Sequence, residues 1–257
     1  MASREFVKQR RKSIVQLLKK TGSIPINRLA NFFSVSTITI RRDLDILQKA
    51  GYVNHTYGIA TFNCNYAKQT GCEYISIKKL ISRTAADLIQ DEDIVLLNSS
   101  STALGIMDYI HSSNVTIITN NGMILEKDYS RDISVILTGG EVRPLKHSLT
   151  GDFTLSMLSQ IRATKCIMGC DGFSAKAGLT THNPNEMQVN KIMLERSDQR
   201  IVVADHRKLG NIANFSYGNI GQIDILITDR GLEKKLLDQF YEMGLKKILL
   251  VSPTKAK

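Results

Sequence analysis

The 257-residue sequence lacks the features that mark several classes of protein. No apolar run approaches the roughly 18 residues that a membrane-spanning helix needs, and no apolar stretch follows the polar N-terminus as a secretory signal requires. The four cysteines form no C-x-x-C pair and have no histidines at zinc-site spacing. No G-x-G-x-x-G or Walker loop is present. We therefore expect a protein of the reducing cytoplasm, with neither a metal site nor a nucleotide cofactor.

Positive charge is in excess, and it is unevenly distributed along the chain. The formal net charge is +10. Residues 1–60 hold 11 Lys and Arg against 3 Asp and Glu, whereas the remainder holds 23 against 21. A compact basic segment joined to a near-neutral one suggests a polyanion-binding head on a separate body. Charge alone leaves open the alternative that the basic residues only make helix surfaces soluble.

The basic segment has the order of elements expected of a winged helix-turn-helix. Apolar residues recur at helical spacing in three stretches, and Gly51 ends the last of them. Ser36 or Thr37 is the expected N-cap of the third helix, because a side-chain oxygen there accepts a hydrogen bond from the first turn. We predict helices over 4–20, 26–33 and 37–50, then extended segments over 52–55 and 59–62 that are joined at Gly58.

The third helix has two different faces. Ile40, Leu44 and Leu47 form one apolar stripe and are predicted core residues. A helix used only for packing has little reason to expose Ile38 and two adjacent arginines, whereas a recognition helix places such residues in the major groove. The residues of this helix and of the turn before it that we expect to face DNA are Ser36, Thr37, Ile38, Thr39, Arg41, Arg42 and Lys49.

These residue types match the groups that duplex DNA presents. Arg41 or Arg42 can form a bidentate pair with guanine, and Ile38 can contact a thymine methyl group. The hydroxyls at the start of the helix can hold a phosphate. Asp45 lies on the same face, and we expect it at the groove edge or in an ion pair with Arg41 or Arg42. The alternative is a helical hairpin with a solvated basic face and no nucleic-acid ligand.

The head contains the stretch Leu29-Ala30-x-x-Phe33-x-Val35-Ser36-x-x-Thr39-Ile40-Arg41-Arg42-Asp43-Leu44-x-x-Leu47-x-x-x-Gly51. This stretch closely resembles the DNA-binding signature of DeoR-family bacterial regulators. In the family, the wing continues with an arginine and then His-Gly-Gly-Ala, whereas this chain has His55-Thr56-Tyr57-Gly58-Ile59-Ala60. A mostly neutral His55 thus replaces a cation, and the resemblance implies DNA contacts from the helix more than from the wing. His55 is the DNA-binding residue expected from the wing.

Beyond the head, the sequence predicts a linker and an α/β body. Residues 63–77 are polar and irregular, and we take them as the linker. From residue 78, helical segments alternate with continuous Val, Ile and Leu runs, as expected of a mostly parallel sheet covered on both faces. Expected strands are 94–97, 115–119, 133–138, 165–169, 200–204, 223–228 and 246–251. Expected helices are 79–89, 101–111, 121–128, 152–160, 185–197 and 232–243.

Small and polar residues follow five of these strands. Ligands of parallel α/β sheets bind beyond the carboxyl ends of the strands, so these segments are expected to converge on one pocket. Their hydroxyls, amides, carboxylates and few cations suit a phosphorylated sugar or polyol. Such turns are often polar and glycine-rich without any ligand, which is the alternative for each segment alone. The expected pocket residues from these segments are Asn98, Ser99, Ser100, Ser101, Thr102, Asn120, Gly139 and Gly140.

The body also resembles the effector domain of the DeoR family, whose sheet is similar to that of ribose-5-phosphate isomerase. Family blocks are matched by Gly169–Gly172, Gly178–Thr181 and Asp205–Lys208. The resemblance implies that Asp171 and Lys208 line the pocket, with Glu186 and Lys191 as further candidates. The family's phosphate-binding loop usually reads Asp-Ser-Gly-Thr-Thr, whereas this chain places Asn98 at the carboxylate and Ser100 at the glycine. The Thr181-His182-Asn183 run resembles members that serve amino-sugar pathways.

Together these features predict a sequence-specific regulator of transcription and not an enzyme. Its domains are expected at 1–62, 63–77 as the linker, and 78–257. The expected partners are double-stranded operator DNA, a phosphorylated sugar and further copies of the chain, as a dimer or tetramer. The chain is expected to repress a carbohydrate-utilisation operon. One alternative is an isomerase-like enzyme, since Asp171, Glu186 and Lys208 are groups that transfer protons. Another is an adaptor without an effector.

Overall fold

The computed structural model describes residues 4–49, 52–56, 58–62, 73–143 and 146–252. Their contacts divide the chain into two compact units, Met1–Ile75 and Ser76–Lys257, which we call the head and the body. The predicted linker lies mostly outside the described residues. Its last part is helical, because the first helix of the body begins at residue 73 rather than 79. No helix in the described part of the chain is long and apolar enough to cross a membrane.

The head is a winged helix-turn-helix, as the sequence predicts. Its three helices are α1 (Arg4–Thr21), α2 (Ile26–Phe32) and α3 (Thr37–Lys49). The wing consists of β2 (Val53–Thr56) and β3 (Ile59–Phe62), which pair antiparallel. A third strand, β1 (Ser23–Pro25), pairs with β3 and was not predicted, because three residues are too few to show a period.

The head has its own hydrophobic core. Ile14 and Leu18 of α1 pack with Leu29 of α2 and with Ile40 and Leu44 of α3, all completely buried. This confirms the predicted apolar stripe of the third helix.

A buried carboxylate joins the first and third helices of the head. The two oxygens of Asp43 each accept a hydrogen bond from an arginine of α1, Arg10 and Arg11, at 2.7 Å. The side chains of Asp43 and Arg10 are 2% and 7% exposed. Two of the basic residues counted in the head therefore neutralise an internal carboxylate, so they contribute less to the surface charge than the sequence count suggests.

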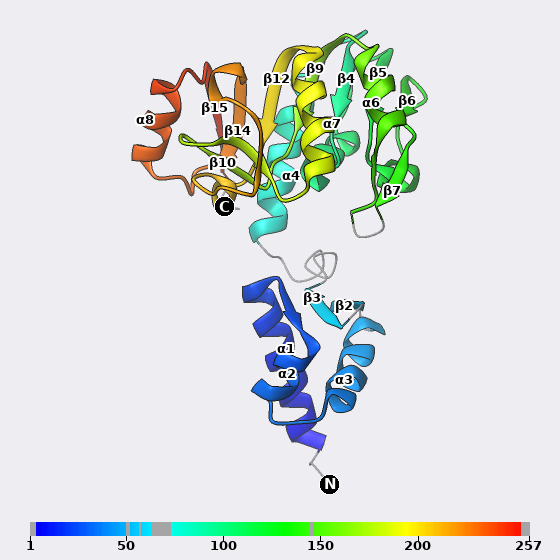
Figure 1. Cartoon of the computed structure of the whole chain (residues 1–257), viewed down its shortest axis with the longest axis vertical. Helices are drawn as coiled ribbons and strands as arrows, with labels where there is room; N and C mark the ends of the chain where they lie inside the picture. Colours follow the sequence, from blue (N-terminus) through cyan, green and yellow to red (C-terminus); the bar gives the residue numbers. More distant parts are fainter. Residues whose placement is uncertain (1–3, 50–51, 57, 63–72, 144–145, 253–257) are drawn as a thin grey trace, which may run out of the picture. The chain divides into compact units, whose positions relative to one another are not determined.

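The body is built on seven parallel strands in the order β15-β14-β12-β9-β4-β5-β6 (Figure 1). Every neighbouring pair in this sheet is parallel, which confirms the predicted α/β class. The strands are β4 (Ile94–Leu97), β5 (Val115–Thr119), β6 (Ile133–Leu137), β9 (Ala163–Met168), β12 (Ser197–Val203), β14 (Ile225–Asp229) and β15 (Lys247–Val251).

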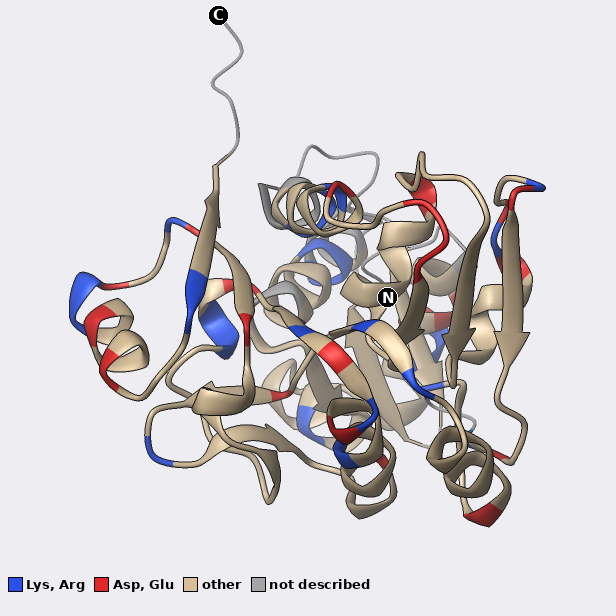
Figure 2. Cartoon of the chain, turned by 90° about the horizontal axis from the view of Figure 1, so that it is seen from above, with Lys and Arg blue, Asp and Glu red and all other residues tan. Residues whose placement is uncertain are grey.

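Helices cover both faces of the sheet. Buried residues of α4 (Glu73–Ala86) and α5 (Ser101–Leu104) pack on one face. Those of α6 (Asp152–Ser159), α7 (Pro184–Glu195) and α8 (Lys234–Glu242) belong to the second core, on the other face. Charged residues of both signs are spread over the body, in keeping with its near-neutral composition (Figure 2).

Two of the predicted helices are shorter than expected. The segment predicted over 101–111 is α5 followed by the 3-10 turn η2 (Gly105–Asp108), and the segment predicted over 121–128 is only the 3-10 turn η3 (Gly122–Glu126). Short 3-10 turns keep the apolar contacts of a helical pattern without its length, so the sequence pattern does not distinguish them.

Two small antiparallel sheets lie among the connections and were not predicted. One pairs β7 (Glu141–Arg143) with β8 (Ser148–Thr150). The other has the order β10-β11-β13, from β10 (Gly172–Ser174), β11 (Gly178–Thr181) and β13 (Phe215–Gly218). The 3-10 turn η4 (His206–Lys208) precedes β13, and η5 (Ile220–Gln222) follows it. The short strands of the two small sheets follow the carboxyl ends of the main strands, so they bring additional side chains to that edge.

Candidate DNA-binding surface and effector site

The recognition helix begins with a side-chain cap. Ser36 precedes α3, and its Oγ accepts a hydrogen bond from the Thr39 N–H at 3.2 Å. The Thr39 hydroxyl lies 2.9 Å from the same oxygen. Of the two expected capping residues, Ser36 is therefore the N-cap, and Thr37 is the first helical residue.

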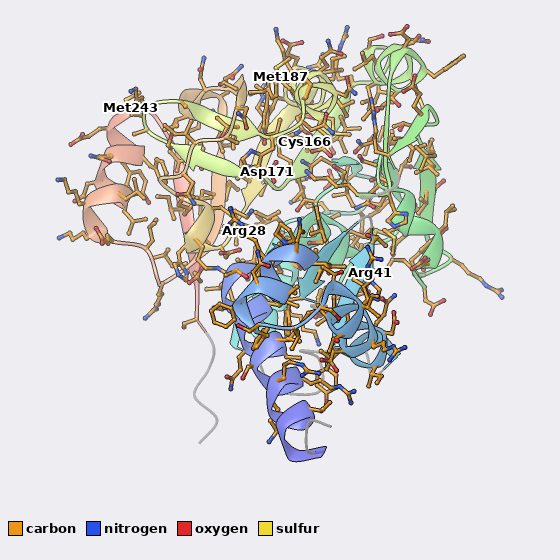
Figure 3. All side chains as sticks on the ribbon, turned by 60° about the horizontal axis from the view of Figure 1, so that its bottom comes forward. Arg28, Arg41, Cys166, Asp171, Met187 and Met243 are labelled. Carbon is orange, nitrogen blue, oxygen red and sulfur yellow. The ribbon has the colours of Figure 1, made fainter. Side chains whose placement is uncertain are left out.

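The predicted DNA-facing residues form an exposed face at the start of α3. The Ile38 side chain is 62% exposed although it is strongly apolar. Arg41, labelled in Figure 3, and Arg42 are also exposed, as is Thr37, whereas Thr39 is partly buried. The side chain of Lys49 lies outside the described residues. An apolar side chain next to two arginines is the combination that base edges and phosphates of a major groove can satisfy.

Of the two placements expected for Asp45, the ion pair with Arg41 or Arg42 is not the one that forms. Its carboxylate pairs with neither Arg41 nor Arg42 but with His55 of the wing, whose Nε2 lies 2.8 Å from Asp45 Oδ1. The His55 N–H also donates to the side chain of Gln48 at 3.3 Å. Both contacts join β2 to α3, and the histidine side chain is only 20% exposed. His55 is therefore held against the recognition helix.

In the body, Asn98 is used by the fold itself. Its side-chain nitrogen donates to the Gly169 carbonyl at 2.9 Å and to Asn190 Oδ1 at 3.1 Å. Its oxygen accepts from the Gly169 N–H at 3.0 Å and from the Ser100 N–H at 3.2 Å. The residue is 3% exposed. Asn98 thus joins the loops after β4 and β9 to α7, and no donor or acceptor of its amide is left for a ligand.

The serines after Asn98 have different surroundings. Ser100 is the N-cap of α5, and its Oγ accepts from the Thr102 N–H at 3.2 Å. Ser101 is exposed, and its hydroxyl accepts a hydrogen bond from Lys78 Nζ at 3.2 Å. Thr102 is buried, and Ser99 is half-buried. Of the hydroxyls in this loop, those of Ser99 and Ser101 are the more accessible to a ligand.

A charged cluster lies beside this loop, at the carboxyl ends of the strands. Lys146 Nζ lies 2.9 Å from Glu186 Oε2 and 3.6 Å from Asp171 Oδ2. The Thr181 hydroxyl donates to Asp171 at 3.0 Å, and that of Ser148 to Glu186 at 3.3 Å. Asp171, labelled in Figure 3, lies between β9 and β10, and Glu186 in the first turn of α7. The structure therefore brings two predicted site residues together.

The sequence reasoning missed Lys146. It lies in the turn between β7 and β8, a pair of strands too short to be predicted. Lys146 follows a proline and a leucine and belongs to no recognisable sequence motif. Its contact with the Asp171 and Glu186 carboxylates becomes evident only from the β7–β8 hairpin. The signal available in the sequence was indirect: a lysine in the polar segment that follows a strand end.

The electrostatics of the cluster favour its charged state. Burial by itself raises the pKa of the Asp171 carboxyl, but the His182 backbone N–H and the charge of Lys146 more than offset this. With a hydrogen bond from Thr181 and the charge of Lys208, that pKa lies below its usual value. Burial lowers the pKa of Lys146, yet hydrogen bonding and charge from Glu186 and Asp171 raise it above its ordinary value. These hydrogen bonds and charges therefore favour the ionised forms of both Asp171 and Lys146.

Of the other predicted pocket residues, Lys208 acts on the cluster through its charge, whereas Lys191 lies away from it. Asn120 is 1% exposed, and its amide nitrogen donates to the Leu149 carbonyl at 3.0 Å, beside Ser148. Its Oδ1 is buried without a protein partner among the described residues. Lys208 is near enough for its charge to act on Asp171. Lys191, by contrast, is on the exposed side of α7, where its side chain is 62% exposed and lies 4.0 Å from Glu195.

Gly139 and Gly140 form a tight turn in which packing and backbone conformation favour glycine. Both have positive φ, +69° and +108°, which favours glycine. A Cβ at Gly140 would overlap the Thr154 hydroxyl and the Thr150 carbonyl. That hydroxyl donates to the Gly139 carbonyl at 2.6 Å. The two glycines therefore permit close packing of the turn on β8 and α6, whatever they contribute to a ligand.

The cysteines and metal-binding residue types show no site of their own in the described chain. Cys166 is completely buried, and this burial raises the pKa of its thiol to about 12, so the thiolate is suppressed. Within the described ranges, no three His, Cys, Asp or Glu side chains are grouped as a metal ion would require.

An exposed recognition helix in a small head, joined to a body with a charged cluster at its strand ends, defines a DNA-binding protein with a sensor domain. The chain belongs to the DeoR family of transcriptional regulators. The DeoR-like helix-turn-helix domain matches residues 10–65, and the DeoR C terminal sensor domain matches residues 73–230.

Similar proteins include named regulators. The chain is 32% identical to the HTH-type transcriptional regulator GolR of Listeria innocua, over 93% of this chain and 97% of that protein. It is 30% identical to a lactose phosphotransferase system repressor of Staphylococcus epidermidis, over 86% and 92%. Among solved structures, ribose 5-phosphate isomerase A of Methanocaldococcus jannaschii aligns with a TM-score of 0.37 and 15% identity, over 53% of this chain and 55% of that one.

Proposed function

We propose that this regulator represses a carbohydrate-utilisation operon and that a phosphorylated sugar bound at the strand ends of the body relieves the repression. The observation that carries this proposal is the Lys146–Glu186–Asp171 cluster, which holds two carboxylates and an ammonium group. Asp171 follows Gly169, which lies against Ser100 of the β4 loop. A relative named as a lactose phosphotransferase system repressor supports the sugar as ligand class.

The cluster has the groups that recognise a phosphorylated polyol. Carboxylates accept hydrogen bonds from sugar hydroxyls. The Lys146 ammonium, nearly half exposed, is a donor for hydroxyl or phosphate oxygens. Ser99 and Ser101 supply hydroxyls next to the N-terminus of α5, where a phosphate is favoured. Asn98 supports this loop from beneath, so its role is to position the loop and not to contact the sugar.

The head supplies the DNA contacts. Arg41 and Arg42 read base edges or phosphates from α3, Ile38 contacts a thymine methyl, and the start of α3 holds a phosphate. One small head rarely gives specific binding, so two or more copies of the chain place their heads on a repeated or palindromic operator. The sugar shifts the equilibrium between DNA-competent and incompetent arrangements of those heads.

The body acts as a sensor without turnover. The named relatives are transcriptional regulators. The Asp171 and Glu186 carboxylates are already bound to Lys146 and to hydroxyls, an arrangement suited to recognition. An isomerase has no need of a DNA-binding head. Product analysis in the experiment below separates the two functions.

The test begins with the purified full-length chain and fragments of DNA from its own genome. Fragments recovered by binding identify the operator and the adjacent genes, and light scattering gives the number of copies bound. Affinity for that operator is then measured with a panel of sugar phosphates, with the parent sugars and inorganic phosphate as controls. We expect one sugar phosphate to weaken DNA binding without being converted. Formation of an isomerised product, or recovery of no specific fragment, would contradict the proposal.

A further inference from the structure

This inference rests on the proposed function, in which α3 meets DNA: the Asp45–His55 pair joins that helix to the wing. Asp45 lies on the exposed face of α3 that also carries Arg42, and its side chain is 56% exposed. DNA affinity depends on neutralising phosphates, so a carboxylate on this face opposes binding unless something compensates its charge. The group that contacts it is His55, at 2.8 Å.

Among the described residues, Asp45 is the charged group that contacts His55. From α3, Asp45 and Gln48 face it, and Gln48 is neutral. From the paired strand, the residue opposite His55 is Ala60, and β3 holds no titratable residue. Its neighbours in β2, Asn54 and Thr56, are uncharged as well. The ion pairs of the described residues thus give His55 a single charged partner.

The hydrogen bond itself survives loss of the proton. A neutral histidine with its hydrogen on Nε2 still donates to a carboxylate, so the wing remains joined to α3 in either state. What changes is the net charge of the pair, which is zero with His55 protonated and minus one with His55 neutral. That unit of charge lies next to the phosphates of a bound duplex, where the protonated state is favoured.

We propose that the Asp45–His55 pair makes DNA binding by this regulator dependent on protons. With His55 protonated, the carboxylate is neutralised and the head binds tightly. With His55 neutral, Asp45 presents an uncompensated negative charge to the duplex and binding weakens. An arginine at position 55 would neutralise the Asp45 carboxylate at every pH. With a histidine there, the neutralisation of Asp45, and with it the DNA affinity, varies with pH.

The size of the effect follows from linkage. Uptake of one proton on binding changes the affinity by at most about tenfold per pH unit. We expect the affinity to fall by about five- to thirtyfold between about pH 6 and about pH 8, within the range where histidine side chains in proteins change charge. The salt dependence should also differ: the slope of log affinity against log salt should be steeper at the lower pH, by up to about 0.9.

The experiment uses the full-length chain and a short duplex selected by that chain from a random-sequence library. Affinity is measured across this pH range for wild type and three variants. His55→Gln should be independent of pH at the weak level, and His55→Arg independent of pH at the tight level. Asp45→Asn should strengthen binding at both ends of the range, because it removes one negative charge whether or not His55 is protonated. His111→Gln, which changes an exposed histidine of the body, is the control and should retain the wild-type profile.

Several outcomes would overturn the inference. They are a wild-type affinity that does not change with pH, a His55→Gln variant that keeps the dependence, or a His111→Gln variant that loses it. Thermal unfolding of each variant checks that the head remains folded, and the salt slope is a second readout that a purely structural role would not move. Arg42→Ala tests the surface separately: if it weakens binding while the pH profile is flat, the DNA-facing surface stands and only the role of His55 is wrong.

Discussion

Gly169 lies directly against Ser100. A Cβ at position 169 would overlap both Oγ and Cβ of the serine, and the same serine oxygen caps α5. The backbone N–H and carbonyl of Gly169 are both bound by the Asn98 side chain, at 3.0 Å and 2.9 Å. The loop after β4 and the loop after β9 are therefore one packed unit, with no space for a methyl group between them.

Gly169→Ala should consequently damage the effector site through packing. The methyl group would displace Ser100, weaken the α5 cap and cost about 1–3 kcal/mol of stability, as overpacking generally does. Denaturant unfolding and the response to effector measure the two effects. Gly221→Ala is the matched control, since its Cβ would meet only the Met243 carbonyl at 3.6 Å. Adding Ser100→Gly to Gly169→Ala should recover stability; no recovery would mean that the overlap is not the cause.

Asp43→Ala should unfold the head without affecting the body. Removing the carboxylate leaves the buried Arg10 and its neighbour Arg11 without their partner, and breaking such a pair costs about 3–5 kcal/mol. Calorimetry should show loss of the head's transition while that of the body persists. Asp45→Asn, on the same helix but exposed, should leave both transitions in place. Equal stability of the two variants would refute the importance of the α1–α3 ion pair.

Arg42→Ala should reduce operator affinity. If Arg42 reads a base, the loss is about 1–3 kcal/mol and specificity relaxes at one operator position. If it contacts only phosphate, binding weakens for all sequences and the salt slope decreases by about 1. Arg162→Ala in the body, whose side chain is 84% exposed, is the control for loss of one surface charge. Unchanged affinity and salt slope in Arg42→Ala would show that another face of α3 meets DNA.

Lys146→Gln should abolish the response to effector while operator binding without effector is retained. The substitution removes the ammonium group that neutralises Glu186 and Asp171, so the site would repel an anionic ligand. Isothermal calorimetry with the identified sugar phosphate measures the affinity. Lys191→Gln removes the same charge from the exposed face of α7 and should bind the sugar as wild type does. A stronger effect of Lys191→Gln would place the site elsewhere.

Stability of the body should fall in acid. Burial raises the pKa of Asp229, but hydrogen bonds from the His206 N–H and ring, from Gly231, and the charge of His206 lower it below 3.8. Asp171 is also lowered. Carboxylates with a depressed folded-state pKa stabilise the fold above their unfolded value and lose that contribution as the pH falls through the folded value.

Denaturant unfolding at a series of pH values checks this acid dependence. The free energy of unfolding should begin to fall below about pH 5 and continue to fall below pH 4. Asp229→Asn should reduce stability at neutral pH and flatten the acid limb. Asp198→Asn, at an exposed pair with Arg162, should leave the limb unchanged. An acid limb of the same steepness in Asp229→Asn would rule out this carboxylate as a cause.

The sequence by itself determined what depends on neighbours along the chain. The apolar spacing of α3, its cap and the glycine beyond its end are local, so the helix and its exposed arginines were predicted within a residue or two. The seven strands were predicted as well, because strands buried on both faces are continuous apolar runs. These features were enough for the winged helix-turn-helix and the α/β class.

Only the tertiary structure decided which polar groups meet. Asn98 is occupied by Asn190, far along the chain, and Lys146 reaches Glu186 from a hairpin of three-residue strands. Lys191, five residues from Glu186 on the same helix, faces away. The physical reason is that hydrogen bonds and ion pairs depend on distances of about 3 Å, which are set by packing between elements and leave no period in the sequence.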